Sequence, residues 1–449
     1  MGDVIKNGVH ISTDEERYQY PSDPIIRERL EWFRDQKLAL LIHFGPHAQM
    51  GLDCSWPLPE KSRWARDEID WEDDLDVFRK QYIDLNKSFN PMRFQPDEWA
   101  DFAAENGFRY LIFTTKHHDG FCLYDSKYTD YKVTAPDCPF HGHKYADITK
   151  NIFDAFRKKG LGIAAYFSKS DWHCPWYWAK GMDKPWGADR DPTYVPAEHP
   201  ELWEKFIEFT HGQMMEIIEG YGKIDILWLD GGQVSVHFGQ DIRLGELVEK
   251  ARRIQPWLIT ADRCVGGPHE NYITPEQTIP DHVIEAPWES CVTHGTIWSY
   301  KYDDDYKSSR QLVKMLIEVV SHGGNLALGV GPQPDGRLPG RAMKEIRGLG
   351  EWLRVNGDAI YGTRAADIAR CGKVMFTKKA DTLYALIPLE EGEELPDTVL
   401  IPLKSKPREI RALGHADALT FCTKEDGSYV TLSDSLVGTS PYAIVFSIK

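Results

Sequence analysis

Side chains able to do chemistry follow a series of short apolar runs in the first two thirds of the chain. They stand in Ile42-His43-Phe44-Gly45, Lys116-His117-His118-Asp119, Tyr166-Phe167-Ser168, Trp228-Leu229-Asp230-Gly231, Asp262-Arg263 and Trp288-Glu289. A single His or Asp after a strand often only packs or turns the chain. The repetition at six places indicates that these side chains line one pocket.

The residue types in this series are typical of a sugar-binding pocket. Flat apolar faces are offered by Trp56, Trp172, Trp228, Trp288 and Trp298, and fixed hydrogen-bond donors by His43, His117, His118 and Arg263. Sugars have apolar C–H faces and a rim of hydroxyl groups, so they fit such a mixture.

Cleavage of a sugar requires two carboxyl groups, one at the anomeric carbon and one that protonates the leaving oxygen. Asp230 is the best-placed candidate for the first role, because it directly follows an apolar run. Glu276, in Thr274-Pro275-Glu276, and Glu289, in Trp288-Glu289-Ser290, are the candidates for the second role.

The elements that must position these residues alternate between apolar runs and amphipathic segments. We expect strands at Leu38–Phe44, Tyr110–Thr115, Gly162–Ser168, Asp225–Asp230, Leu258–Asp262, Val283–Ala286 and Asn325–Val330. We expect helices at Pro96–Asn106, Ile148–Lys159, Glu201–Gly220, Gly245–Ile254 and Tyr306–Ser321. Strands that are apolar on both faces and separated by helices predict a parallel (β/α)8-like TIM barrel over residues 1–356, with one strand degenerate or missed.

The pattern of apolar and polar residues changes after Gly357. Short alternating runs at Val374–Thr377, Thr382–Ile387, Thr398–Ile401, Ala412–Gly414, Tyr429–Leu432 and Ala443–Ile448 are separated by Gly, Pro and acidic turns. This pattern predicts a C-terminal antiparallel β-sandwich over residues 357–449.

Composition excludes several classes of partner. The net charge of −16 disfavours nucleic acid and anionic membranes, and no apolar run is long enough to span a bilayer. The start lacks the pattern of a signal peptide, so we expect a cytoplasmic protein, or a secreted or periplasmic one if a signal has been removed. The eight scattered cysteines form no Cys-x-x-Cys pair, and most are expected to be buried thiols. The sequence does not indicate an oligomeric state.

Several motifs, in order along roughly residues 30 to 365, resemble glycoside hydrolase family 29, the α-L-fucosidases. They are Phe89-Asn90-Pro91 with Trp99-Ala100, Lys116 to Phe121, Trp228-Leu229-Asp230-Gly231, Asp262-Arg263, Trp288-Glu289-Ser290-Cys291, Gly323-Gly324-Asn325-Leu326 and Ile360-Tyr361-Gly362. The resemblance implies a retaining exo-α-L-fucosidase that acts on fucosylated oligosaccharides or glycoconjugates without a metal or other cofactor.

The resemblance also implies roles for single residues. Asp230 matches the nucleophile, and Trp298 matches an aromatic residue beside the C5 methyl group of fucose. The hydroxyl-binding positions are matched by His43, His117, His118, Tyr166, Trp228 and Arg263, and Trp56 is a further substrate-binding candidate. The acid/base varies in position within the family. Glu276 is favoured for it and Glu289 is the alternative.

The sequence departs from the family at three places near the pocket. The usual His-Trp-Gly is His43-Phe44-Gly45 here, and the loop Gln49–Arg63, which carries Trp56, is unusual. The usual Ser-Trp-Gly-Tyr is Ile297-Trp298-Ser299-Tyr300. An α-L-galactosidase on the same scaffold is therefore the main alternative, because that sugar is fucose with a hydroxyl on C6.

Two alternatives come from other classes of protein. One is a non-catalytic carbohydrate-binding protein, which the presence of Asp230 with two candidate acids disfavours. The other is a metal-dependent barrel enzyme using His117, His118 and Asp119. We disfavour it because neighbouring strand residues are expected to point to opposite sides.

Overall fold

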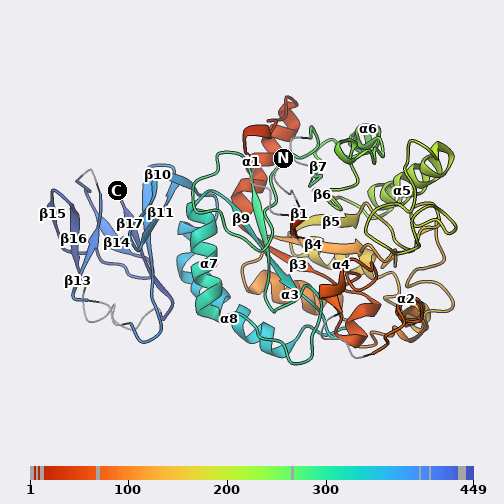
Figure 1. Ribbon diagram of the computed structural model, residues 1–449. Coiled ribbons are helices and arrows are strands. Elements are labelled where there is room, and N and C mark those ends of the chain that lie inside the picture. Colours follow the sequence, from red (N-terminus) through yellow and green to blue (C-terminus); the bar gives the residue numbers. More distant parts are fainter. Residues whose placement is uncertain are drawn as a thin grey trace.

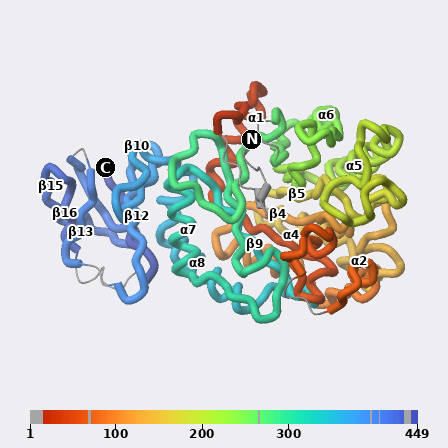
Figure 2. The backbone as a smooth tube through the Cα atoms, in the orientation of Figure 1, coloured from red at the N-terminus to blue at the C-terminus, as the bar shows by residue number. Residues whose placement is uncertain are grey.

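The computed structural model describes residues 15–66, 71–263, 267–393, 396–403, 406–432 and 441–449, preceded by the paired short strands β1 (Ile5–Lys6) and β2 (Val9–His10). It shows a barrel-like domain with a smaller all-β part at one side, which contains the C-terminus (Figure 1). The tube in Figure 2 follows the same path from the N-terminus to the C-terminus. No helix among the described residues is long and apolar enough to cross a membrane.

A curled, parallel sheet of seven strands forms the centre of the larger domain, in the order β7-β6-β5-β4-β3-β9-β8. The strands are β3 (Leu38–Ile42), β4 (Tyr110–Lys116), β5 (Gly162–Ser168), β6 (Ile226–Asp230), β7 (Ile259–Ala261), β8 (Glu289–Thr293) and β9 (Asn325–Val330). Nearly every residue in them is buried, as expected for strands covered by helices on one side and by the barrel interior on the other. The predicted TIM-barrel class is confirmed.

Helices surround these strands (Figure 1). They are α1 (Pro24–Gln36), α2 (Leu75–Asp84), α3 (Pro96–Glu105), α4 (Ile148–Lys158), α5 (Pro200–Gly220), α6 (Leu244–Ile254), α7 (Ser309–Ser321) and α8 (Gly340–Asn356). Local signals fix several ends: Asp23, Asp74 and Asp147 cap α1, α2 and α4, and Ser308 with Gln311 forms a capping box on α7.

One sequence prediction about the barrel is wrong. Val283–Ala286 is not a strand, and β8 begins later, at Glu289. The gap between β7 and β8 is filled instead by an irregular segment, residues 270–276. Glu270 bridges Ala261 of β7, while Ile273 and Glu276 bridge Trp288 and Cys291 in parallel. This segment takes the place of the degenerate strand, and Glu276 stands at its C-terminal end.

The C-terminal part is a β-sandwich, as predicted. A five-stranded sheet has the order β10-β11-β12-β17-β14, with β10 (Arg364–Cys371), β11 (Val374–Lys379), β12 (Thr382–Pro388), β14 (Ile410–Ala412) and β17 (Ala443–Ile448). It faces a three-stranded sheet, β13-β16-β15, formed by β13 (Thr398–Ile401), β15 (Phe421–Lys424) and β16 (Gly427–Thr431). Alternation along β12 explains the packing. Ala385 and Ile387 enter the sandwich core, whereas Leu386 joins the main core on the side of α7.

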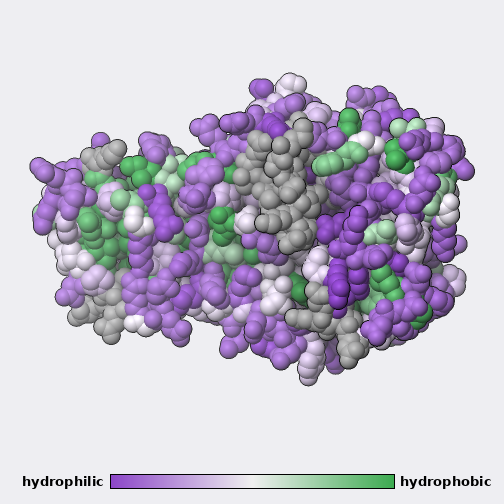
Figure 3. Space-filling model, viewed as in Figure 1, coloured by the Kyte–Doolittle hydropathy of each residue, from purple (hydrophilic) through white to green (hydrophobic). Residues whose placement is uncertain are grey.

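Apolar side chains form only small, separate patches on the face shown in Figure 3, which is otherwise hydrophilic. Most cysteines are buried thiols, as expected: Cys54, Cys122, Cys138, Cys174 and Cys291. Cys371 and Cys422, in the sandwich, are exposed, and Cys264 lies outside the described residues.

Candidate active site

The carboxylate of Asp230 lies at the C-terminal end of β6, the end at which barrel active sites are built. It accepts hydrogen bonds from the hydroxyl of Tyr166 (2.5 Å) and from the backbone N–H of Gly231 (2.8 Å). His118 Nε2 lies 3.3 Å from it and Arg263 Nη1 lies 3.7 Å from it. Burial alone would raise the pKa of Asp230, but Arg263, His118 and Tyr166 hold that pKa well below its usual range. The Asp230 carboxyl group is therefore ionised near neutral pH.

Arg263 joins this carboxylate to a second one. Its Nη2 donates to Glu276 Oε2 at 2.5 Å while Nη1 faces Asp230. The guanidinium is buried and lies 4.7 Å from the ring centroid of Trp228. Two carboxyl groups on one fixed cation are an arrangement that can serve a two-carboxylate mechanism.

Backbone hydrogen bonds to β8 hold the segment that carries Glu276. The backbone N–H of Cys291 donates to the carbonyl of Pro275 (3.1 Å), and that of Gln277 donates to the carbonyl of Cys291 (2.9 Å). Glu276 thus reaches the pocket from a firmly attached irregular strand.

Three histidines surround the Asp230 carboxylate. His117 and His118 both face the site, with ring centroids 4.6 Å apart. The expectation that they point to opposite sides is wrong, because β4 ends at Lys116 and both rings belong to the turn that follows. Ser55 Oγ holds His117 Nδ1 at 2.6 Å, and Ser170 Oγ holds His118 Nδ1 at 2.7 Å.

His43 completes the group from the end of β3. Its ring lies 5.3 Å from that of Tyr166 and 5.2 Å from that of Trp298. Burial lowers the pKa of His43 to about 3 and holds the pKa of His117 well below its usual value. Both imidazoles are therefore neutral near pH 7, so each ring can donate one hydrogen bond and accept one.

These side chains line a cavity of about 300 Å³, a volume that includes its open side. Its lining is formed by Leu41, His43, Trp56, His117, Tyr166, Trp228, Asp230, Arg263, Glu276, Cys291 and Trp298. His118 contacts the Asp230 carboxylate but is not among the lining residues. Of the predicted tryptophans, Trp172 stacks behind His118 (4.8 Å between ring centroids), and Trp288 is buried away from the cavity with its N–H on the carbonyl of His322.

Glu289 is separated from the cavity. It starts β8 and therefore lies at the opposite end of the barrel from Asp230 and Glu276. It is fully buried, and its carboxyl group accepts hydrogen bonds from Tyr110 Oη and from Trp228 Nε1, the latter at 2.9 Å. Because Trp228 stacks on Tyr166 (5.0 Å, 16°), Glu289 braces the floor of the site.

The buried position of Glu289 predicts a pH dependence of stability. Burial raises the pKa of Glu289 from 4.5 to about 7. Between these pH values the folded state keeps a proton that the unfolded chain has lost. Glu289 therefore makes its full contribution to the free energy of unfolding below about pH 4.5. This contribution, on the order of 3 kcal/mol, is lost as the pH rises to about 7.

Urea unfolding at pH 5 and pH 8 tests this expectation. The difference in unfolding free energy between the two pH values should be smaller in Glu289→Gln than in the wild type, because glutamine does not titrate. An equal difference in both proteins would show that Glu289 does not carry the effect.

Several residues of the site were not singled out in the sequence. Ser55 and Ser170 fix the two histidines, and Asp53 accepts the backbone N–H of Trp298 at 3.1 Å. Lys169 pairs with Asp262 (2.6 Å), so the predicted polar residue after β7 is structural. The residue types of Ser55, Ser170 and Lys169 carry no local signal of these roles, and only their neighbours in space reveal them.

Comparison with known proteins places the chain in a family. The family model described as Alpha-L-fucosidase matches residues 7–358, which is most of the chain. The chain belongs to this family. It is therefore a retaining glycoside hydrolase that releases α-L-fucose and acts on fucosylated glycans.

Three relatives of this fucosidase family match over most of their length. Human plasma alpha-L-fucosidase is 28% identical over 439 residues, covering 92% of this chain and 88% of the relative. Alpha-L-fucosidase isoenzyme 1 from Paenibacillus thiaminolyticus is 30% identical with a TM-score of 0.78, covering 95% of this chain and 99% of that one. The Thermotoga maritima alpha-fucosidase in complex with fucose is 26% identical with a TM-score of 0.76, covering 96% and 100%.

Proposed function

We propose that Asp230 is the nucleophile and Glu276 the acid/base of a double displacement on terminal α-L-fucosides, within a catalytic domain of residues 1–356. The observation that carries the proposal is the pair of carboxylates joined by Arg263 in one cavity. Glu289 has no place in this chemistry, because it lies at the other end of the barrel.

The two carboxyl groups act in sequence. Asp230 attacks the anomeric carbon while Glu276 gives a proton to the leaving oxygen, and a fucosyl ester of Asp230 forms. Glu276 then takes a proton from water, which attacks the anomeric carbon and releases fucose. Arg263 and Tyr166 stabilise the carboxylate of Asp230 when it is regenerated.

The remaining lining residues bind the sugar. His43, His117, Tyr166 and Arg263 offer hydrogen bonds to its hydroxyl groups, and His118 acts through Asp230. Trp228 offers its ring alone, because its N–H already donates to Glu289. Trp56 and Trp298 offer flat apolar faces, with Trp298 beside the C5 methyl group. Neutral imidazoles beside flat aromatic rings suit an uncharged monosaccharide end group.

A panel of aryl glycosides tests the sugar preference. We expect α-L-fucoside to be cleaved with a kcat/KM about 10–100 times that for α-L-galactoside, since an apolar pocket rejects an added hydroxyl only moderately. No cleavage of β-D-galactoside is expected. Faster cleavage of the α-L-galactoside would assign the enzyme to that sugar instead.

A further inference from the structure

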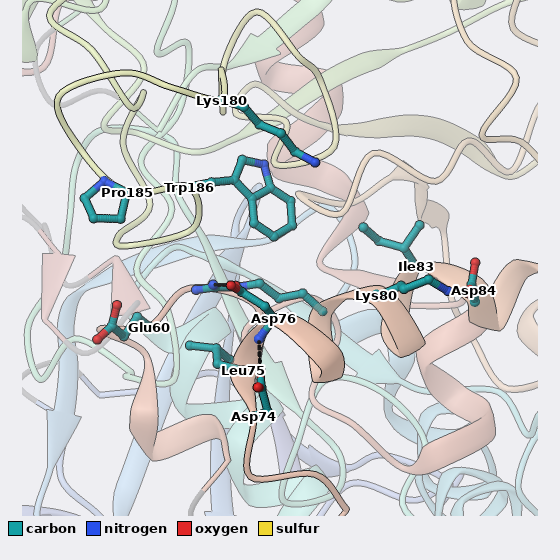
Figure 4. Close-up of a pocket in the computed structure, with 11 residues that line it drawn as sticks. Glu60, Asp74, Leu75, Asp76, Lys80, Ile83, Asp84, Lys180, Pro185 and Trp186 are labelled. Atoms are coloured by element: carbon teal, nitrogen blue, oxygen red, sulfur yellow. Dashed lines mark hydrogen bonds and ion pairs between the residues drawn. The ribbon is translucent and has the colours of Figure 1, made fainter.

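A groove separate from the catalytic cavity lies between α2 and the loop that carries Trp186 (Figure 4). Its volume, including its open side, is about 1520 Å³. The lining comes from three segments and consists of Glu60, Asp74, Leu75, Asp76, Arg79, Lys80, Ile83, Asp84, Lys180, Pro185 and Trp186. None of these residues lines the cavity around Asp230.

The groove has a firmly held floor. The buried guanidinium of Arg79 donates to the carbonyls of Leu58 (2.9 Å) and Gly187 (2.6 Å) and to Asp76 (2.9 Å), so it ties α2 to both loops. Gly187 has φ +75°, and a Cβ there would lie 2.5 Å from Arg79 Cζ. Glycine is therefore required for this contact, and the groove exists as a preorganised surface.

The chemistry of the lining suits a neutral sugar chain. Figure 4 shows the indole of Trp186 between Lys180 and the side chains of α2, and the ring is half-buried. Charges of both signs are paired within the lining, Arg79 with Asp76 and Lys80 with Asp84 (2.6 Å), so no strong charge of one sign selects an ion. A flat apolar ring among many donors and acceptors matches the faces and hydroxyl groups of carbohydrates.

Two short segments run side by side from this groove to the catalytic cavity. In residues 56–60, Trp56 lines the cavity and Glu60 lines the groove. In residues 186–190, Trp186 lines the groove and the guanidinium of Arg190 lies 4.6 Å from the ring centroid of Trp56. The backbone N–H of Glu60 donates to the carbonyl of Gly187 (2.8 Å), which joins the two segments.

A series of four tryptophan rings in contact sets an upper limit on the distance between the two sites. Ring-centroid steps of 5.6, 5.4 and 5.8 Å lead from Trp186 through Trp178 and Trp172 to Trp56, so the first and last rings are at most about 17 Å apart. A short oligosaccharide can span such a separation.

We propose that this groove is a second carbohydrate-binding site, which holds the neutral oligosaccharide part of a substrate whose terminal fucose occupies the cavity. This inference rests on the proposed function of the cavity. Arg79 of the floor lies over the Trp186 ring (5.3 Å from guanidinium to ring centroid), and so does the exposed amine of Lys180 (5.4 Å). Trp186 supplies the stacking surface once the exposed Lys180 side chain moves aside, and Lys180 then supplies a hydrogen-bond donor at the rim. The groove thereby favours longer fucosylated glycans over small fucosides.

Kinetics of Trp186→Ala on a small and a large substrate test the proposal. A nitrophenyl α-L-fucoside fills only the cavity, so its kcat/KM should stay within twofold. The kcat/KM for a longer neutral fucosylated oligosaccharide should fall about tenfold, mainly through KM, as when a central aromatic contact is truncated. Trp186→Phe should restore most of the loss. Trp257→Ala, at another half-buried tryptophan outside both sites, is the control and should leave kcat/KM for both substrates unchanged.

A fucose-free tetrasaccharide of galactose and N-acetylglucosamine tests binding directly by saturation-transfer NMR. We expect a signal with the wild type and with Trp257→Ala, and none with Trp186→Ala. Lys180→Ala, at an exposed side chain that cannot threaten folding, should raise KM two- to threefold for the oligosaccharide alone. Absence of tetrasaccharide binding to the wild type, or equal losses on both substrates in the Trp186 variants, would overturn the proposal. If the wild type did not cleave the nitrophenyl fucoside at all, the proposed function itself would be refuted.

Discussion

Replacing Asp230 by alanine should lower the turnover of a nitrophenyl α-L-fucoside by at least about a thousandfold, because the covalent step loses its nucleophile. The structure gives the residue no substitute. Glu276 approaches from the other side of Arg263, and Glu289 is buried at the opposite end of the barrel. Tyr166 and Arg263 would remain in place, so the cavity should still bind the sugar.

Azide provides the diagnostic measurement for this variant. The small anion can enter the space left by the Asp230 side chain and attack the anomeric carbon from the same side. Part of the rate should return, and the product should be a β-L-fucosyl azide, identified by proton NMR. A variant that keeps more than about a tenth of the wild-type rate would remove Asp230 from the mechanism, since a tenfold loss corresponds to only about 1.4 kcal/mol. Near-UV circular dichroism should show that the fold is intact.

Replacing Glu276 by alanine should make the loss of activity depend on the leaving group. A sugar alcohol needs a proton to depart, whereas a nitrophenolate does not. Cleavage of a fucosylated oligosaccharide should therefore fall by about 10²–10⁴-fold, the range for a general acid. The formation of the fucosyl ester from a nitrophenyl fucoside should stay fast, and its hydrolysis should become rate-limiting. Azide should accelerate that second step, and here the product should be the α-L-fucosyl azide.

Two matched variants sharpen the assignment. Glu276→Gln can keep a hydrogen bond to Arg263 but cannot transfer a proton, so it should behave like Glu276→Ala if acid catalysis is the role. Glu289→Ala removes the carboxylate that accepts the Trp228 N–H, so it should lower kcat/KM for both substrates by similar factors. Azide should not restore activity in this variant. Leaving-group dependence and azide rescue in Glu289→Ala, together with their absence in Glu276→Ala, would reverse the two roles while leaving the reaction class unchanged.

The stereochemistry of the azide product distinguishes the roles of Asp230 and Glu276. A β-azide reports that the nucleophile is missing, and an α-azide reports that the fucosyl ester still forms but its acid/base is missing. The pair of variants is thus informative even if the absolute rates differ from these expectations.

Much of the barrel could be predicted from the sequence because its strands are defined locally. Gly162–Ser168 and Asn325–Val330 have the predicted bounds as β5 and β9, since a fully buried strand reads as an uninterrupted apolar run. In the sandwich, Thr398–Ile401 and Ala443–Ile448 are likewise predicted to the residue. The position of Asp230 at a strand end follows from the same local pattern, and so does its proposed role.

Only the tertiary structure separates Glu276 from Glu289. In the sequence both stand near apolar residues, and the run Val283–Ala286 makes Glu289 look like a residue that follows a strand. The strand begins at Glu289 instead, because residues 289–293 pair with β9, more than thirty residues later in the chain. Pairing between distant segments carries no local signal. It places Glu289 at the wrong end of the barrel and Glu276, on an irregular segment broken by Pro275, beside Arg263 and the cavity.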